Sequence, residues 1–364
     1  FRSTFTGQAA MLLPGSPGAT LQPDPVFYAK LLRSASKIIN KVDANDEVWI
    51  GSLVSPSSGS CAMNPMKFLL EIHGARGWNS ADAISYQPDW GATAPENPVS
   101  SNSACNSSVT TDSSNMANDV HSIQELARQL GGMPVYITSL GWSVGELSSL
   151  AANRNISLAQ VEADMLTRAS VSIMGLDTVP LIFWNTDVTP QTATAVTLHN
   201  LASQLDNAKA IGQAQGSTGN VFEYRFKKGV NLKVFAWRST DGDAGSSVSI
   251  ANLPASSYIA YAPDTQVLNN TMGSAIKVAA DGSTVIGLNE RPIFLLGKVG
   301  NIGEQVQSAI ADQLDMWRIQ FGELLKQWLN EAKASFIRMF EDFVNKAKDN
   351  AIDWGEQQIN DLLH

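Results

Sequence analysis

The chain has 364 residues, of which 44% are hydrophobic and 16% are charged, and its formal net charge is -9. This hydrophobic content supports a packed core and excludes a disordered polypeptide, and the length allows two domains. The 25 Lys and Arg residues form no basic run, which excludes a nucleic-acid surface, and no stretch reaches the roughly 18 apolar residues of a membrane span.

Helix and strand signals alternate from Asp24 onward. Asp24 and Pro25 start a helix in which apolar residues recur at helical spacing as far as Ile39. The sequence then predicts four strand-helix units, with strands at 47–54, 82–90, 133–142 and 179–187 and helices at 64–77, 116–132, 157–175 and about 190–205. This alternation predicts a parallel sheet covered by helices, either an open α/β sheet or a (β/α)8 barrel. Because only four strands are expected, a complete barrel is excluded.

After Gly216 the sequence changes to short runs in which apolar and polar residues alternate, separated by Gly, Asp, Asn and Pro. This pattern predicts a small antiparallel β-sandwich. The expected fold class is therefore α/β plus all-β. We expect four regions: an extended segment 1–23, an α/β region 24–210, a β-sandwich 211–298 and a helical tail 299–364.

The tail is the most charged part of the chain. Residues 301–364 hold eleven acidic and six basic residues, and apolar residues follow a near-heptad path from Val306 to Trp354. From Trp328 several consecutive spacings of four shift this path toward an 11-residue repeat. An amphipathic helix of this length must bury its stripe in a hairpin, on the same chain, against other copies or on a membrane. The acidic excess disfavours the membrane.

The composition of the first 300 residues, rich in Ser, Thr, Asn, Ala and Gly, is typical of exported proteins and predicts a secreted or extracellular location. Cys61 and Cys105 both lie in Ser/Asn-rich segments, where they form either a disulfide or two free thiols. The chain also holds three acceptor motifs for N-glycosylation, at Asn106, Asn155 and Asn269. It begins at Phe1 without a basic and apolar signal segment, which a processed precursor or a start later than the biological one would explain.

A family resemblance rests on the order of several runs. MPVYITSLGW (133–142) resembles the seventh barrel strand of the clan A retaining glycoside hydrolases, especially family 39, whose usual form is Lys-Pro-aromatic-hydrophobic-Thr-Glu-Phe/Leu-Gly-Trp. EVWIGSLVSP is similar to the fifth strand, DAISYQPDWG to the sixth and VPLIFWNTD to the eighth, and VFAWRS and LNERPIFLLG resemble strands of the accessory sandwich. The resemblance covers roughly residues 20–298. It implies strands five to eight of a (β/α)8 barrel followed by a sandwich.

The same resemblance implies that the catalytic motifs are lost. A retaining glycosidase needs two carboxyl groups about 5 to 5.5 Å apart. Ser139 stands where the family has its nucleophilic Glu, the Asn-Glu-Pro motif of the acid/base Glu has no counterpart, and Gln87 replaces the His of the sixth strand. A chance match by an ordinary α/β protein, or an engineered Ser139 in an active enzyme, are the alternatives. The second would leave Gln87 and the missing Asn-Glu-Pro motif unexplained.

Other residues at the strand ends are candidates for site roles. Substitute carboxylates would be Asp89, Glu146 or Asp187, but the simpler interpretation of each is a solvated loop residue. Sugar-binding candidates are Gln87, Trp90, Trp142 and Trp184, of which Trp142 and Trp184 could equally belong to the core. No cofactor motif is present, and the four histidines show no ligand spacing, so no metal site is expected.

The leading functional hypothesis is a non-catalytic, extracellular structural or glycan-binding subunit that assembles through its C-terminal helices. The alternative is a fragment of a secreted retaining glycosidase whose first four barrel strands come from a separate polypeptide, because four parallel strands leave unpaired edges. In a third arrangement two half-barrels pair between copies of the chain.

Overall fold

The computed structural model describes residues 24–55, 63–99, 114–152, 156–176, 179–185, 193–215, 220–228, 231–239, 247–253, 257–264 and 274–297, which we call the described residues. By its internal contacts the chain divides into two units, residues 1–300 and 301–364, and all described residues belong to the first.

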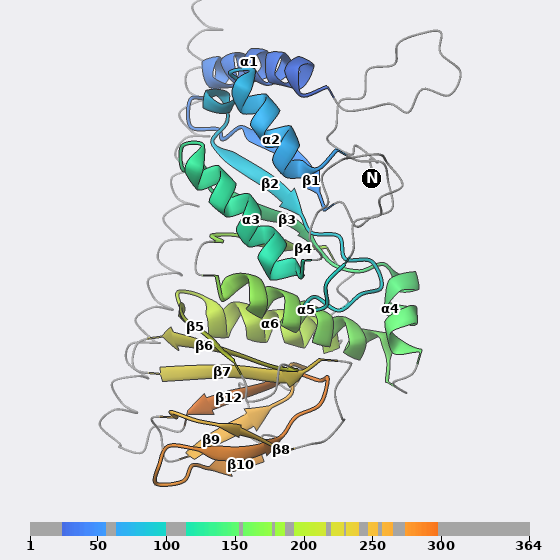
Figure 1. Cartoon of the computed structure of the whole chain (residues 1–364), viewed down its shortest axis with the longest axis vertical. Helices are drawn as coiled ribbons and strands as arrows, with labels where there is room; N and C mark the ends of the chain where they lie inside the picture. Colours follow the sequence, from blue (N-terminus) through green and yellow to red (C-terminus); the bar gives the residue numbers. More distant parts are fainter. Residues whose placement is uncertain are drawn as a thin grey trace, which may run out of the picture. The chain divides into compact units, whose positions relative to one another are not determined.

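Six α-helices and twelve strands are present in the described residues (Figure 1). The helices are α1 (Pro25–Val42), α2 (Pro65–Gly74), α3 (Met116–Gln129), α4 (Val144–Ala151), α5 (Leu158–Met174) and α6 (Ala193–Leu205), with a 3-10 turn at Trp78–Ser80. The first strands are β1 (Trp49–Val54), β2 (Ala83–Gln87), β3 (Val135–Leu140) and β4 (Ile182–Trp184). The later strands are β5 (Lys209–Gln215), β6 (Val221–Lys228), β7 (Asn231–Arg238), β8 (Ser247–Ile250), β9 (Ser257–Tyr261), β10 (Ser274–Lys277), β11 (Thr284–Gly287) and β12 (Ile293–Gly297).

The first four strands form a parallel sheet in the order β1-β2-β3-β4. This is the sheet predicted from the alternating pattern. One face of it packs on α1, α2, α3 and α5, and residues such as Ile50, Ile84 and Ile137 on that face are fully buried. The second face carries Trp49 and Tyr136, whose rings meet edge to face with centroids 4.8 Å apart.

The helices begin at the cap residues that the sequence indicates. The Asp24 side chain accepts a hydrogen bond from the Phe27 amide at 2.9 Å, and the Asn64 side chain accepts one from the Met66 amide at 2.8 Å. Ser157 starts α5 with a complete capping box. These bonds satisfy amide groups that have no partner inside the helix, and so they fix where each helix starts.

Eight strands form antiparallel sheets, one of six strands in the order β10-β9-β12-β7-β6-β5 and one of two, β11-β8. The six-stranded sheet packs against α5 and α6 through an aromatic cluster in which Phe235 stacks on Phe294 at 4.7 Å. Helix α5 thus lies between the parallel and antiparallel sheets (Figure 1), and every residue from Val161 to Ile173 except Glu162 is buried.

Three elements differ from the sequence prediction. Helix α4 occupies a segment that we assigned to no element, and strands β5 and β10 were not predicted. No helix among the described residues combines the length and the apolar content needed to cross a membrane.

Candidate functional site

The candidate site is the edge of the parallel sheet where β1 to β4 end, because (β/α) folds place their functional side chains at the carboxyl ends of strands. Ser139 is half-buried near the end of β3, and Gln87 ends β2. The Gln87 side-chain amide donates a hydrogen bond to the Ser52 hydroxyl at 3.2 Å. Ser52 lies at an irregularity of β1 and has a positive φ of 20°, so the end of β1 bends at this contact.

Beyond β3 the chain comes very close to the end of β4. An ideal Cβ placed on Gly141 would lie 2.0 Å from the carbonyl oxygen of Asn185, so only glycine fits there. The Asn185 amide donates to the Leu140 carbonyl at 2.8 Å. The site edge is therefore closely packed between β3 and β4.

The two predicted carboxylates that are described each bind a backbone amide of their own turn. The Asp89 carboxylate accepts from the Gly91 amide at 3.1 Å, and Glu146 accepts from the Ser143 amide at 2.6 Å in the capping box that starts α4. Glu146 therefore lies in the first turn of a helix, not in the solvated loop that we expected. Asp187 lies outside the described residues.

The three tryptophans of the site belong to the core. Trp90 is 4% exposed and Trp142 is 8% exposed, and Trp184 is partly buried. The Trp90 indole N–H donates to the Asn97 carbonyl at 3.1 Å, and that of Trp184 donates to the Ser170 hydroxyl at 2.9 Å. The Trp142 indole N–H is buried and has no hydrogen-bond partner among the described residues. Of these three tryptophans, Trp142 is thus the one whose indole N–H donates to no described residue.

Behind the site edge, on the helix-covered face, the Tyr86 hydroxyl donates a hydrogen bond to the Asp119 carboxylate of α3. Burial raises the pKa of Tyr86 well above its usual value, and the Asp119 charge raises it further. Burial also raises the pKa of Asp119, which the bond from Tyr86 partly offsets. A buried pair with a carboxyl of raised pKa resembles a catalytic arrangement. It lies among the helices rather than at the strand ends, however, so we regard it as structural.

Sequence reasoning also missed the buried charges around α5. Arg168 is fully buried and pairs with Glu96, which follows β2, through two nitrogens, one of them at 3.1 Å. Burial lowers the pKa of Arg168 to about 9, so the guanidinium stays charged at neutral pH. Arg291, before β12, lies 3.6 Å from the buried Asp164 of α5 and also pairs with Asp264. Because the partners of these ion pairs lie far apart in the sequence, no local motif predicts the pairs.

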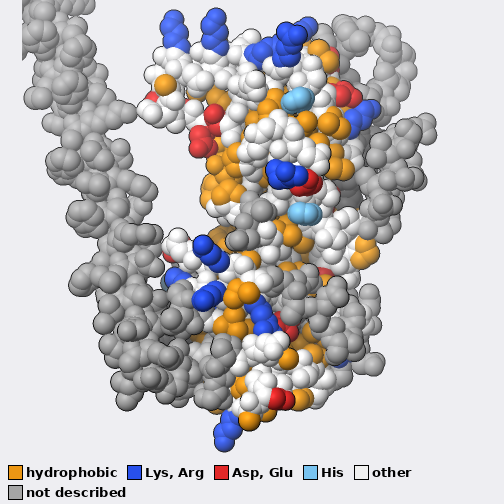
Figure 2. All heavy atoms as spheres, turned by 60° about the vertical axis from the view of Figure 1, so that its left-hand side comes forward, with side chains coloured by type: hydrophobic (Ala, Val, Ile, Leu, Met, Phe, Trp, Pro, Cys, Tyr) orange, Lys and Arg blue, Asp and Glu red, His pale blue; other side chains and the backbone are white. Residues whose placement is uncertain are grey.

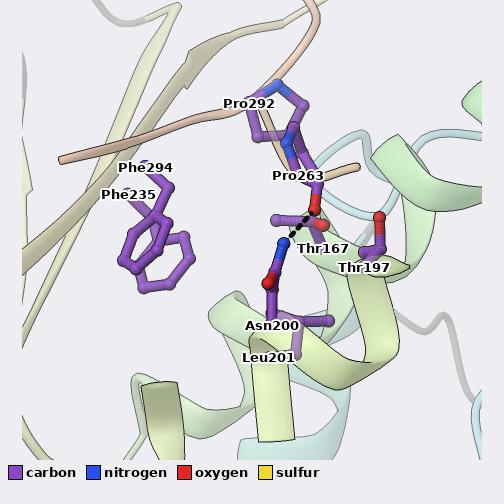
Figure 3. A pocket seen from close by; sticks show the side chains of 8 residues that line it. All are labelled: Thr167, Thr197, Asn200, Leu201, Phe235, Pro263, Pro292 and Phe294. Atoms are coloured by element: carbon purple, nitrogen blue, oxygen red, sulfur yellow. Dashed lines mark hydrogen bonds between the residues drawn. The ribbon is translucent and has the colours of Figure 1, made fainter. Parts of the chain in front are cut away.

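A small cavity lies between α5, α6 and the antiparallel sheet (Figure 3). Its volume of about 10 Å³ has room for roughly one water molecule. The lining residues are Thr167, Thr197, Asn200, Leu201, Phe235, Pro263, Pro292 and Phe294. The Asn200 side-chain amide donates across it to the Pro263 carbonyl at 2.8 Å. The cavity is too small for a sugar ring and does not replace the strand ends as the candidate site.

Several predicted residues lie outside the described residues. These are Cys61, Cys105, Asn106, Asn155 and Asn269, so the disulfide and the glycosylation sites stay predictions. Within the part of the chain that the structure describes, no three His, Cys, Asp or Glu side chains lie together as metal ligands would.

The sequence matches no protein-family model and no curated protein. Its structure is similar to that of a family 39 glycoside hydrolase from the gut symbiont Bacteroides cellulosilyticus WH2, with a TM-score of 0.55 and 16% identity. The match covers 76% of this chain and 56% of that enzyme, so this chain spans little more than half of its length.

Two more distant matches are to a family 51 α-L-arabinofuranosidase from Bifidobacterium longum and to a family 86 β-porphyranase from Bacteroides plebeius. The first has a TM-score of 0.46 and 10% identity, covering 75% of this chain and 64% of that one. The second has a TM-score of 0.46 and 12% identity, covering 76% and 52%. The similarity to the family 39 enzyme confirms that the chain has a glycoside-hydrolase-like fold, as the sequence motifs predicted.

Proposed function

We propose that the chain is a non-catalytic, glycoside-hydrolase-like subunit with a structural or glycan-binding role outside the cell. One observation carries the proposal. Both described carboxylates at the strand ends, Asp89 and Glu146, hold backbone amides of their own turns, and Ser139 stands where the resemblance places the nucleophile. A serine hydroxyl has no negative charge with which to stabilise an oxocarbenium-like transition state.

An assay on a broad panel of aryl glycosides tests the loss of catalysis. We expect no turnover above the uncatalysed rate. Turnover that disappears in Asp89→Asn or in Glu146→Gln would overturn the proposal, because it would show that one of these carboxylates takes part in catalysis.

Trp142 supports the glycan-binding part of the proposal. The Trp142 indole N–H is buried and has no partner among the described residues, so it would donate a hydrogen bond to a sugar hydroxyl when a bound glycan opens the site edge. We expect Trp142→Phe to weaken retardation in affinity gels that contain soluble β-xylan, β-glucan or arabinan. Trp90→Phe is the matched control, because it removes a similar buried volume but an indole N–H that the Asn97 carbonyl already satisfies. Equal retardation of both variants in every gel would count against a glycan site at Trp142.

For the remaining regions, we propose that the parallel sheet is half of a (β/α)8 barrel, that the antiparallel sheets form its accessory sandwich, and that residues 299–364 are an amphipathic helical tail for assembly. The near-heptad apolar path of the tail supports its role in assembly. Replacing Trp317 and Trp328 by Glu is expected to lower the oligomer mass in sedimentation equilibrium. An unchanged mass would remove the tail from the assembly.

The second candidate is a retaining glycosidase completed by a separate polypeptide that supplies the other strands. It is favoured by the edge position of β1 and β4, since parallel sheets are normally paired and covered on both faces. Intact-mass analysis of the native material would reveal the companion chain.

A further inference from the structure

Helix α1 has a second apolar face that the described residues leave exposed. Its inner face is buried at Ala29, Leu32 and Ser36 against the parallel sheet and α2. On the outside, four large side chains form what we call the outer stripe, Phe27 (42% exposed), Leu31 (52%), Ile38 (65%) and Val42 (84%). On the helical wheel these positions lie within about 60° of one another. A stripe of this kind on a helix beside an edge strand is suited to packing against another polypeptide.

The opposite edge of the sheet is also apolar and exposed. Leu181 precedes the short edge strand β4 and is 36% exposed, and Phe183 lies within β4 and is 47% exposed. Between the two edges, the second face presents Trp49 and Tyr136, both half-buried. At the β1 edge the Tyr28 hydroxyl accepts a hydrogen bond from the Gly51 amide at 2.7 Å, which protects one donor of the edge strand within a single copy.

Charge restricts what can cover the outer stripe. Helix α1 carries Lys30, Arg33, Lys37 and Lys41 and no acidic residue, and Lys and Arg side chains gather over α1 at the top of Figure 2. Two α1 helices would therefore repel each other, whereas the described residues at the β4 edge, 179–185, include no basic residue that would repel α1.

We propose that two copies of this chain associate edge to edge, with β1 and the outer stripe of each copy against the β4 edge of the other. This proposal rests on the half-barrel part of the proposed function. The strands β1 to β4 run parallel to one another. A twofold axis along the barrel axis keeps the strand direction of both copies the same, so β1 of each copy pairs with β4 of the other and an eight-stranded parallel barrel closes. Each apolar edge is used once, and Trp49, Tyr136 and Phe183 of both copies become the barrel interior.

Sedimentation equilibrium of the purified full chain tests the proposal by measuring the mass of the wild type and of three variants. We expect a dimer at micromolar concentration. Leu31→Glu combined with Ile38→Glu, and separately Phe183→Glu, should each weaken the dimer at least tenfold. Leu70→Glu on α2 is the matched control, because Leu70 is also 50% exposed but lies on neither edge, and it should leave the mass unchanged. An unchanged far-UV spectrum in each variant shows that the fold is kept.

A mixing experiment identifies the contact. A twofold dimer has two equivalent contacts, each between the outer stripe of one copy and the β4 edge of the other. A substitution in either surface is present in both copies, so it damages both contacts. A 1:1 mixture of the outer-stripe variant and Phe183→Glu joins the intact β4 edge of the first to the intact outer stripe of the second, so one contact returns and mixed dimers form.

Three outcomes overturn the proposal: a monomeric wild-type chain, which leaves the edges to a companion polypeptide; a dimer that both edge variants leave intact, which places association in the tail; or a mixture without mixed dimers. None of these bears on the expected lack of glycosidase activity, so failure here is separable from failure of the non-catalytic proposal.

Discussion

Arg168 and Glu96 place opposite charges where no water reaches them, with side chains 0% and 1% exposed. Taking both ions out of water costs several kcal/mol each, and the ion pair together with its hydrogen bonds offsets that cost only while both partners are present. The pair joins α5 to the loop after β2, so it holds the site edge to the layer behind it.

We expect Arg168→Met to lower the free energy of unfolding by about 3–5 kcal/mol, because it leaves the Glu96 carboxylate buried without its partner. The double variant Arg168→Met/Glu96→Gln should recover most of this loss, and urea unfolding of the full double-mutant cycle measures the coupling. Arg128→Ala, which breaks an exposed pair with Glu125 on α3, is the control and should leave the midpoint unchanged. Additive losses in the cycle would show that the buried pair is not coupled.

Asp119 gives the molecule a pH dependence of defined sign. Burial raises the pKa of Asp119 above its usual 3.8, so between that value and the folded-state pKa the folded protein holds more protons than the unfolded one. Stability is therefore highest below pH 3.8 for this group and is lost as the pH rises through the folded-state pKa. We expect Asp119→Asn, which keeps an acceptor for the Tyr86 hydroxyl, to reduce this decline.

Urea midpoints of the wild type and Asp119→Asn between pH 4 and pH 7 check this prediction. A smaller decline remains expected from Glu223, whose pKa burial also raises. If the variant lost stability with pH as steeply as the wild type, Asp119 would not be the group responsible.

At the scale of elements, the pairing of β3 with β4 depends on a glycine that is not in a strand. A Cβ on Gly141 would lie 2.0 Å from the Asn185 carbonyl oxygen and 3.0 Å from its carbon, and backbone atoms cannot move away cheaply. We expect Gly141→Ala to cost about 1–3 kcal/mol of stability. Gly145→Ala in α4 is the matched control: its Cβ meets nothing within 4 Å, and alanine in a helix is better than glycine by up to about 1 kcal/mol. Thermal unfolding of both variants measures the difference, and a Gly141→Ala midpoint at or above the wild type would contradict the prediction.

The elements with two agreeing local signals could be predicted from the sequence. Helices α1 and α5 have both a cap residue and a helical apolar period, and β2 and β3 have dense apolar runs. Helix α4 was missed although Ser143 and Glu146 form a capping box, because Glu146 was read only as a carboxylate. Strand β10 buries no residue, so it has no alternating pattern to detect.

Part of the candidate site could be predicted for a similar reason. Gln87 ends β2 and Ser139 is the last but one residue of the neighbouring parallel strand β3, so strand order alone places them at one edge. The sequence left open whether the tryptophans face sugar or core, and burial of Trp90 depends on packing between distant segments. The pairing of Arg168 with Glu96 spans 72 residues, and only the folded chain brings these two side chains together.

At the scale of the described molecule, α5 and α6 are a layer shared by two sheets. Helix α5 contributes Met165 and Ala169 to the core with the parallel sheet, and Val171 to the aromatic cluster with the antiparallel sheet. Arg291 adds an ion pair from the antiparallel side to Asp164 of α5. Neither sheet can lose α5 without exposing a buried face, so the two should unfold as one cooperative unit.

Leu201→Ala tests this cooperativity. Leu201 lies on α6, is 3% exposed and contacts the aromatic cluster of the antiparallel sheet, so its truncation should cost about 2–5 kcal/mol. In one cooperative unit this loss must reach the amides of β2, in the parallel sheet, as fully as those of β7, in the antiparallel sheet. We therefore expect hydrogen exchange, measured by mass spectrometry on peptides from both strands, to accelerate by the same factor. Faster exchange in β7 with β2 unchanged would show that the two sheets open independently, and that the buried charges of α5 serve only one of them.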